Sequence, residues 1–393
     1  MTIDLTSMQD DLVRLRRRLH QVPEVGLDLP RTRDLVLGAL DGLPLELSTG
    51  KSSTSVTAVL RGGRPGPVVL LRGDMDALPL VERTGLDYTA DGDAMHACGH
   101  DLHSAMLVGA ATALAGRQAD LAGDVVFMFQ PGEEGHDGAL RMIEEGILDA
   151  AGRRADASYA LHVTSGMLPA GLFACRPGQM MAASGALKVS VRGAGGHGSA
   201  PHRAKDPIPA ACAMVTALQT FVTRRFDVFD PVVLTVGSFH AGNAHNVIPD
   251  DAVFEATMRS FSSAAQARLL EESVQVVRGI AAAHGVEVDV TAEELFPITV
   301  NDVGRVAAVA DVVRERFGAE RYLDLPNPLT GSEDFSRVLD AVPGAMVFLG
   351  ATAADADPAT APYNHSPLAA FDDRVLSDGA TLYAELALQH LGG

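Results

Sequence analysis

Cysteine is scarce in this sequence: only three of its 393 residues are cysteine, Cys98, Cys175 and Cys212. A small, odd number argues against a disulfide framework and favours a reducing compartment. Long apolar runs are also lacking, since no stretch reaches the roughly 18 apolar residues of a membrane span. The N-terminal segment places acids before its arginines and has no apolar core, so we expect no secretory signal peptide. These absences predict a cytoplasmic protein without a membrane partner.

Positive charge is under-represented as well. Lys and Arg number 31 against 50 Asp and Glu, which gives a formal net charge of −19 at pH 7. A nucleic-acid partner is therefore not expected, because binding would need a basic face to neutralise phosphates. Hydrophobic residues make up 47% and charged residues 21%, as in globular proteins, which excludes extensive disorder. The length favours two or three domains.

The first part of the chain alternates strand-like and helix-like patterns. Strands are predicted for four apolar runs, at 56–60, 68–71, 125–129 and 158–163. Helices are predicted between them, at 32–40, 101–115 and 138–146. Buried strands that alternate with helices are typical of a mostly parallel α/β sheet covered on both faces. The same pattern resumes near the C-terminus, with a helix at 302–317, a strand at 345–349 and a helix at 372–391.

The pattern changes after Gly178. A strand, a helix, two strands, a helix and a last strand are predicted, at 186–191, 207–224, 232–239, 253–259, 263–284 and 286–291. This β-α-β-β-α-β order is that of a ferredoxin-like unit. We therefore expect a discontinuous catalytic domain, residues 1–182 and 295–393, with an inserted α+β domain at 183–294 that serves as a lid and in dimerisation.

The segment Met95–His103, MHACGHDLH, is the richest in chemistry. Residues two apart share a face of an extended chain, so Cys98 and His100 can point at the same ion. Thiolate and imidazole together suit zinc and similar transition metals. The alternative is a free cysteine with solvated histidines. Spacing alone does not choose among His96, His100 and His103.

Two adjacent acids, Glu133 and Glu134, follow the predicted strand at 125–129. Ligands of α/β proteins bind at the carboxyl ends of strands. Because neighbouring side chains diverge, one carboxylate can ligate a metal while the other faces the substrate as a general base. The alternative, and the commoner case for such a pair alone, is a solvated helix N-terminus where the dipole favours acids.

Three other segments carry candidate residues. Asp74 and Asp76 follow the strand at 68–71, where one can orient a metal-bound imidazole or both can form a turn. His162 ends a strand and His365 lies in a late loop; a lone histidine in either place is more often structural.

The glycine-rich stretch GAGGHGSAPH, residues 193–202, lacks the residues of a phosphate-binding loop. Its His197 is either a polar contact on a mobile lid or an exposed loop histidine.

Taken together, these segments resemble the di-metal amidohydrolases and peptidases that include aminoacylase, hippurate hydrolase, the plant indole-acetyl-amino-acid hydrolases and carboxypeptidase G. The hippurate hydrolase and auxin-conjugate hydrolase branch is the most similar. The stretches that carry the resemblance span nearly the whole chain: RRRLHQVPE (16–24), LRGDMDALP (71–79), MHACGHDLHSAMLVGAA (95–111), FMFQPGEEG (127–135), GGHGSAPH (195–202), NVIPD (246–250), GSEDF (331–335) and NHSP (364–367).

The resemblance implies two divalent ions per subunit, of Zn, Mn, Co or Ni. It implies five metal ligands: Cys98, His100, Glu134, His162 and His365. Glu133 would be the general base and Asp76 the acid behind the metal site. His197 and Asn246 would meet the substrate carbonyl or carboxylate, across the interface of a homodimer. The Asp74-x-Asp76 motif departs from the His-x-Asp of the wider family, a departure shared with the cysteine-containing branch.

The implied activity is hydrolysis of an N-acyl amino acid by a metal-activated water, with Glu133 passing the proton to the leaving amine. The carboxylate of such a substrate needs a local cation in a protein of charge −19, and Arg259 is the candidate. A dipeptidase or carboxypeptidase with the same site is the first alternative. A non-catalytic metal- or peptide-binding protein is the second, which is disfavoured because a pure binder needs no base.

Overall fold

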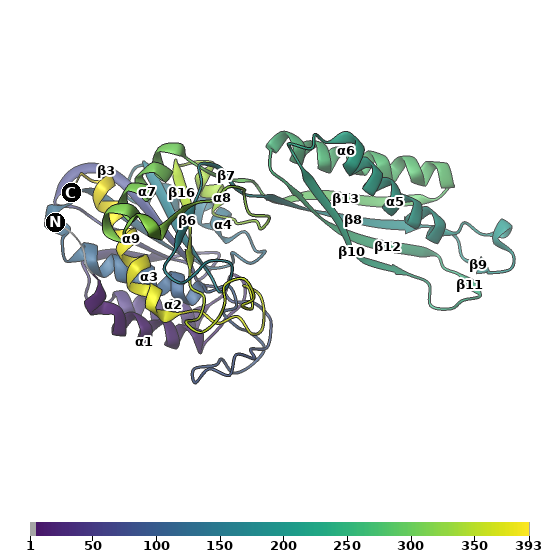
Figure 1. Ribbon diagram of the computed structural model, residues 1–393. Helices are drawn as coiled ribbons and strands as arrows, with labels where there is room; N and C mark the ends of the chain where they lie inside the picture. The colour runs from purple at the N-terminus through teal and green to yellow at the C-terminus, as the bar shows by residue number, and fades with distance from the viewer. Residues whose placement is uncertain (1–4, 393) are drawn as a thin grey trace. The chain divides into compact units, whose positions relative to one another are not determined.

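The computed structural model describes residues 5–392 (Figure 1), and the chain divides into two compact units. The first unit comprises Met1–Met180, Val300–Asn327 and Asp334–Gly393; the second comprises Met181–Thr299 and Pro328–Glu333. Within residues 5–392, none of the helices has the length and apolar character needed to cross a membrane.

The first unit contains an eight-stranded sheet in the order β1-β2-β4-β3-β5-β16-β6-β15. Its strands are β1 (Leu45–Thr49), β2 (Val56–Leu60), β4 (Ala122–Gln130), β3 (Arg64–Asp74), β5 (Ala157–Thr164), β16 (Gly344–Gly350), β6 (Phe173–Cys175) and β15 (Tyr322–Asp324). The pairs β3/β4, β3/β5, β5/β16 and β6/β15 are parallel. The pairs β1/β2, β2/β4 and β6/β16 are antiparallel. The predicted α/β class is confirmed, with a sheet that is mixed and mostly parallel.

The helices of the first unit are α1 (Gln9–His20), α2 (Pro30–Leu40), α3 (His100–Ala115), α4 (Gly138–Glu144), α7 (Val303–Arg316), α8 (Ser336–Leu339) and α9 (Leu376–His390). Helix α3 is almost completely buried, because it packs on β3 and also against α1 and α9. Gly109 permits this close packing, since a Cβ there would lie 2.9 Å from Cβ of Ala380 and 3.0 Å from Leu12. Helix α3 is therefore held by three neighbouring elements.

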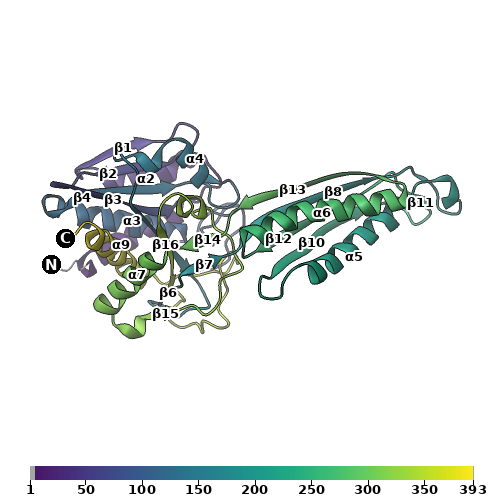
Figure 2. The same ribbon diagram turned by 90° about the horizontal axis from the view of Figure 1, so that it is seen from above.

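The second unit contains a four-stranded antiparallel sheet in the order β10-β12-β8-β13. Its elements follow one another as β8 (Ala183–Arg192), α5 (Pro207–Arg225), β10 (Val232–Ala241), β12 (Asp251–Ser260), α6 (Ser263–His284) and β13 (Glu287–Phe296). Helices α5 and α6 pack side by side on one face of this sheet (Figures 1 and 2). Ser262 caps α6 by accepting a hydrogen bond from Ala265 N, and Gly285, at φ 67°, ends it.

Two short ladders complete the topology. Strands β9 (Gly196–His197) and β11 (Val247–Ile248) pair with each other, and so do β7 (Gly178–Met181) and β14 (Thr299–Asn301). Figures 1 and 2 show β9 and β11 beyond one end of the four-stranded sheet.

Candidate metal centre

The candidate residues of the first unit meet at the carboxyl ends of three neighbouring parallel strands. Asp74 is the last residue of β3, Glu133 and Glu134 follow β4, and His162 lies near the end of β5. Parallel strands that share an edge bring their following loops together, which is where α/β sheets bind ligands. The topology therefore places residues that are far apart in sequence around one point.

Five side chains form overlapping groups whose ligand atoms lie within 4.8 Å of one another. One group is Cys98, His100 and His162, and another is Cys98, Glu134 and His365. The Cys98 Sγ lies 3.4 Å from His162 Nε2, and His365 Nε2 lies 3.0 Å from Glu134 Oε1. These are the five residues that the resemblance implied as metal ligands, and the structure brings all five together.

Gly99 lets Cys98 and His100 face the same point. It adopts φ +88° at the N-cap of α3, a conformation that other residues rarely adopt. A Cβ at this position would also collide with the side chain of Val163. A residue other than glycine would therefore displace either the turn or the end of β5.

The three histidines of MHACGHDLH differ in what their nitrogens contact. His103 is fully engaged: its Nε2 accepts a hydrogen bond from Val163 N at 2.8 Å, and its Nδ1 donates to Asp74 Oδ1 at 2.6 Å. His100 Nδ1 donates to the backbone carbonyl of Asp76 at 2.9 Å, whereas its buried Nε2 has no hydrogen-bond partner. A buried imidazole nitrogen that no hydrogen bond occupies can exchange its proton for a metal, so the structure favours His100 over His103.

His96 is buried, and neither of its ring nitrogens has a hydrogen-bond partner. Burial lowers the pKa of His96 to about 3, so the ring is neutral. Among residues 5–392, His96 belongs to none of the candidate metal-ligating groups, and its ring lies 6.2 Å from that of His20. The His96 ring therefore packs between α1 and the segment that precedes α3.

The side chains of the cluster perturb one another's pKa. Burial, together with the Glu134 carboxylate, raises the pKa of Cys98. Burial opposes the charged form of His100, but Asp74 and the hydrogen bond to Asp76 raise its pKa well above the ordinary value. Hydrogen bonds to Cys98 and Glu134 raise the pKa of His365 to about 10. Strongly coupled thiol, imidazole and carboxyl groups are typical of functional sites, where a cation can take the place of the protons.

Asp76 holds both acids of the Glu133-Glu134 pair. Its Oδ1 accepts a hydrogen bond from Glu133 N and its Oδ2 accepts one from Glu134 N, both at 3.0 Å. Its carbonyl accepts from His100, so one residue orients three members of the cluster. This geometry agrees with an acid that acts behind the site and not as a ligand.

Asn364 is a residue that the sequence interpretation did not single out. Its Nδ2 donates to Cys98 O at 3.2 Å and to Val163 O at 3.0 Å, and its Oδ1 accepts from Ser165 N. The next residue, His365, has φ 70° and donates its N–H to Ala97 O. Asn364 thus ties the loop of His365 to the segments that carry Cys98 and His162. The feature of the sequence that could have indicated Asn364 is its position next to His365 in the NHSP motif.

Arg72 and Asp334 were also missed. Arg72 is fully buried within β3, and its guanidinium contacts Asp74 Oδ2 at 2.5 Å, Asp334 Oδ1 at 3.1 Å and Gln130 Oε1 at 2.9 Å. Burial opposes ionisation of Asp74, but Arg72 and the neighbouring histidines hold its pKa well below the usual range. Two features of the sequence could have indicated these residues: Arg72 is an arginine inside an apolar strand, and Asp334 is an acid of the GSEDF motif.

The candidate substrate-binding residues lie in the second unit. His197 and Asn246 come together at the β9–β11 ladder, where Val247 pairs with His197 and Gly198 N donates to Asn246 O at 2.8 Å. Arg259 lies near the other end of β12, eight residues beyond Asp251, or about 27 Å along a strand at about 3.4 Å per residue. Within this unit the structure does not bring Arg259 to the other two.

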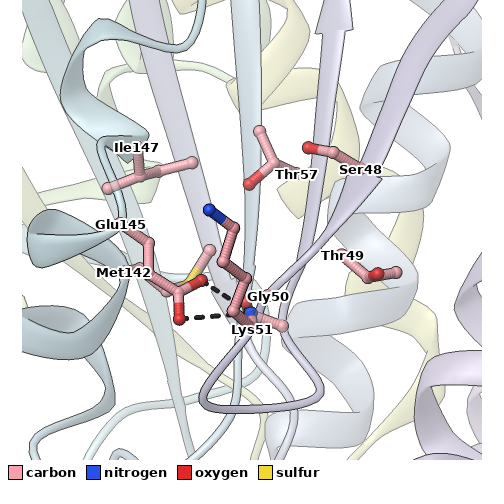
Figure 3. Close-up of a pocket in the computed structure, with 9 residues that line it drawn as sticks. Ser48, Thr49, Gly50, Lys51, Thr57, Met142, Glu145 and Ile147 are labelled. Carbon is pink, nitrogen blue, oxygen red and sulfur yellow. Dashed lines mark hydrogen bonds between the residues drawn. The ribbon is translucent and has the colours of Figure 1, made fainter.

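Figure 3 shows a pocket of the first unit that contains none of the candidate residues. It lies between β1, β2 and α4, and its lining includes Lys51, Thr57 and Glu145. The Glu145 carboxylate accepts hydrogen bonds from Lys51 N, at 3.0 Å to Oε2, and from Ser52. This carboxylate therefore serves to hold the loop after β1.

Comparison with known proteins decides the family. Residues 70–389 match the family described as peptidase family M20/M25/M40. The chain belongs to this family. The M20/M25/M40 proteins with similar sequences include an IAA-amino acid hydrolase, ILR1-like 4, of Arabidopsis thaliana, 37% identical over 97% of this chain and 86% of the relative. They also include the hippurate hydrolase of Campylobacter jejuni, 34% identical over 99% of this chain and 98% of the relative.

A solved M20 structure is similar over the full length. The Bacillus subtilis protein YXEP, described as a dinuclear metal-binding peptidase, is 30% identical, covers 98% of this chain and 99% of its own, and superimposes with a TM-score of 0.82. Together with the M20 relatives, this likeness shows that the chain is a metal-dependent amidohydrolase, an enzyme that cleaves amide or peptide bonds. The predicted family and enzyme class are confirmed.

Proposed function

We propose that this enzyme hydrolyses the amide bond of N-acyl amino acids at a site for two divalent metal ions. The observation that carries the proposal is the buried Nε2 of His100, which has no hydrogen-bond partner and lies 3.5 Å from Asp74 Oδ2, inside the cluster of Cys98, Glu134, His162 and His365. A relative named hippurate hydrolase and another named IAA-amino acid hydrolase support the substrate class, because both names describe N-acyl amino acids.

The donor atoms fit a transition metal better than calcium or magnesium. A thiol and three imidazoles are soft or intermediate ligands, which suit Zn, Co or Ni rather than the hard cations that prefer oxygen. The Glu134 carboxylate adds an oxygen ligand of the kind that Mn accepts. His162 donates its Nδ1–H to Val163 O at 2.9 Å, so in the neutral ring Nε2 keeps its lone pair toward Cys98. Cys98, His100, Glu134, His162 and His365 would hold the ions. When bound, such ions polarise the carbonyl and lower the pKa of water toward 7.

Glu133 is the residue we propose as general base. It is buried, and its carboxylate lies in a group with His100 and Glu134 whose ligand atoms are all within 4.8 Å. From there it would take a proton from the attacking water and deliver it to the leaving nitrogen. Asp76 would fix the direction of the carboxylate through Glu133 N.

Recognition of the substrate carboxylate would fall to Arg259, and contact with the scissile group to His197 and Asn246. About 27 Å of strand separates Arg259 from the end of β12 nearest the other two, which exceeds the length of an N-acyl amino acid. One subunit cannot offer all three to one substrate. We infer that the second unit is a lid and dimerisation domain, and that His197 and Asn246 serve the site of a partner copy.

The proposed compartment is the cytoplasm. Cys98, Cys175 and Cys212 are all free thiols, and an oxidising compartment would expose the Cys98 thiolate to oxidation.

A substrate panel tests the function. The metal-free protein is loaded with Zn, Mn, Co or Ni and assayed on N-acetyl and N-benzoyl amino acids and on dipeptides. Faster hydrolysis of the N-acyl substrates by a metal-loaded form supports the proposal. Faster hydrolysis of dipeptides would favour a dipeptidase or carboxypeptidase, an alternative supported by the thermostable carboxypeptidase 1 of Saccharolobus solfataricus, 35% identical over 98% of this chain.

A further inference from the structure

The motif RRRLHQVPE contributes two residues to a buried ion-pair network that the proposed chemistry does not use. Helix α1 contributes Arg16 and His20, both buried. Arg16 Nε lies 2.8 Å from Asp101 Oδ2, and its Nη1 donates to the Tyr88 hydroxyl at 2.6 Å. His20 Nδ1 lies 2.7 Å from the same Asp101 oxygen, and its Nε2 lies 3.1 Å from Glu82 Oε2.

His20 bridges two carboxylates through its two ring nitrogens. A neutral imidazole carries one N–H, so hydrogen bonds from both nitrogens to carboxylates require the imidazolium form. Burial opposes that charge, but Asp101 and Glu82 raise the pKa of His20, and the pKa of each carboxyl is lowered in turn. Glu82 also accepts hydrogen bonds from Ala90 N and from the Thr84 hydroxyl. Both ring nitrogens of His20 therefore form charge-assisted hydrogen bonds to carboxylates.

The two carboxylates lie on opposite sides of the candidate ligands in the chain. Asp101 follows His100 directly, in the first turn of α3. Glu82 lies in the segment 75–99, which ends at Cys98 and Gly99 and contains no helix or named strand.

Backbone contacts tie that segment at both ends, where Met75 N donates to Gln130 O and Ala97 O accepts from His365 N. Leu78 and Met95 form an isolated bridge, Ala77 N donates to Glu24 O, and Arg83 N donates to Pro367 O. Between these points side chains add further anchors, since Glu82 and Tyr88 both contact cationic side chains of α1.

We propose that His20 is a positioning residue for the metal centre: by clamping Glu82 of the segment before Cys98 to Asp101 of the turn after His100, it sets the separation and direction of these two ligands. The role rests on the proposed metal site. His20 touches neither ligand, so it acts through the two carboxylates. Its loss should weaken metal binding and leave substrate contacts unchanged.

The test measures metal affinity in the full-length protein, not activity alone. Metal-free wild type, His20→Gln, Glu82→Gln and the double variant are titrated with Co²⁺, and the absorption of the cobalt–thiolate pair reports binding. We expect His20→Gln to weaken affinity about tenfold, at the lower end of the range for residues behind metal ligands. The double variant should lose less than the product of the two single effects, because both changes break one bridge. KM at saturating metal should stay at the wild-type value.

Two controls separate positioning from general destabilisation. His284→Gln changes the last residue of α6, an exposed histidine at the same helical position in the second unit, and should leave affinity unchanged. Leu12→Ala removes buried apolar contacts of α1 without touching the network; it should lower the thermal midpoint but not the cobalt affinity.

Equal affinity in His20→Gln and His284→Gln would overturn the inference. So would a loss in Leu12→Ala as large as that in His20→Gln at a similar thermal midpoint. A wild-type protein that binds no metal would instead overturn the proposed function.

Discussion

Asp76→Asn is the substitution whose consequence the structure defines most sharply. The Asp76 side chain is fully buried, and its two oxygens each accept one backbone N–H, from Glu133 and Glu134. Asparagine has the same shape but replaces one oxygen with an NH₂ group. One of the two backbone N–H groups would then face a donor in place of an acceptor.

The magnitude follows from these two hydrogen bonds. A hydrogen bond to a charged group contributes about 1.5–3 kcal/mol, and a buried N–H left without an acceptor costs about 1–3 kcal/mol. Because the amide can still satisfy one N–H, we expect a loss of about 2–4 kcal/mol, concentrated at the Glu133-Glu134 turn. For each 1.4 kcal/mol of that loss that raises the activation barrier by misplacing the base, kcat falls about tenfold.

The assay compares kcat, metal content and the free energy of unfolding of Asp76→Asn with those of Asp302→Asn. Asp302 accepts a backbone hydrogen bond at the N-cap of α7, where asparagine caps equally well, so this control should retain all three. We expect Asp76→Asn to lose kcat and to bind metal more weakly. Wild-type kcat and metal affinity in Asp76→Asn would refute the idea that this carboxylate positions the two acids.

The remaining predictions concern the cluster itself. Glu133→Gln should retain its metal and fold while kcat falls about 10²–10⁴-fold, as metal analysis and steady-state kinetics would show; a near-normal rate would remove Glu133 as the base. Cys98→Ala should lose metal and activity together, whereas Cys175→Ala, which removes a buried thiol outside the cluster, should keep both; full metal content in Cys98→Ala would exclude it as a ligand. In the metal-free protein the pKa of His365 is raised to about 10 beside Cys98 and Glu134. A raised pKa stabilises the fold below the ordinary value near 6.5 and loses that contribution as pH rises toward 10, so the thermal midpoint should fall over this range more in wild type than in His365→Gln.

Much of the architecture could be predicted because it depends on local pattern. The apolar runs at 68–71 and 125–129 lie inside β3 and β4, and the helical pattern at 101–115 corresponds to α3. A continuous apolar run specifies a strand buried on both faces wherever it lies in the chain. Strand direction was not accessible in this way: β2 pairs antiparallel to β4, and that pairing depends on how a distant segment returns to the sheet.

For the candidate site too, some features could be predicted from the sequence and others only from the tertiary structure. Sequence motifs and the resemblance they carry indicated which segments bear the chemistry, since thiol, imidazole and paired carboxylates are visible as letters. Spacing did not distinguish His100 from His103, and the resemblance only implied His100. The tertiary structure supplies the physical reason, which is a hydrogen bond from Val163 N to His103 Nε2 and the lack of one to His100 Nε2. Only the fold paired Arg72 with Asp334, which lies 262 residues away. Residue type determines what a side chain can bind, whereas the partner it meets depends on long-range packing that no local pattern encodes.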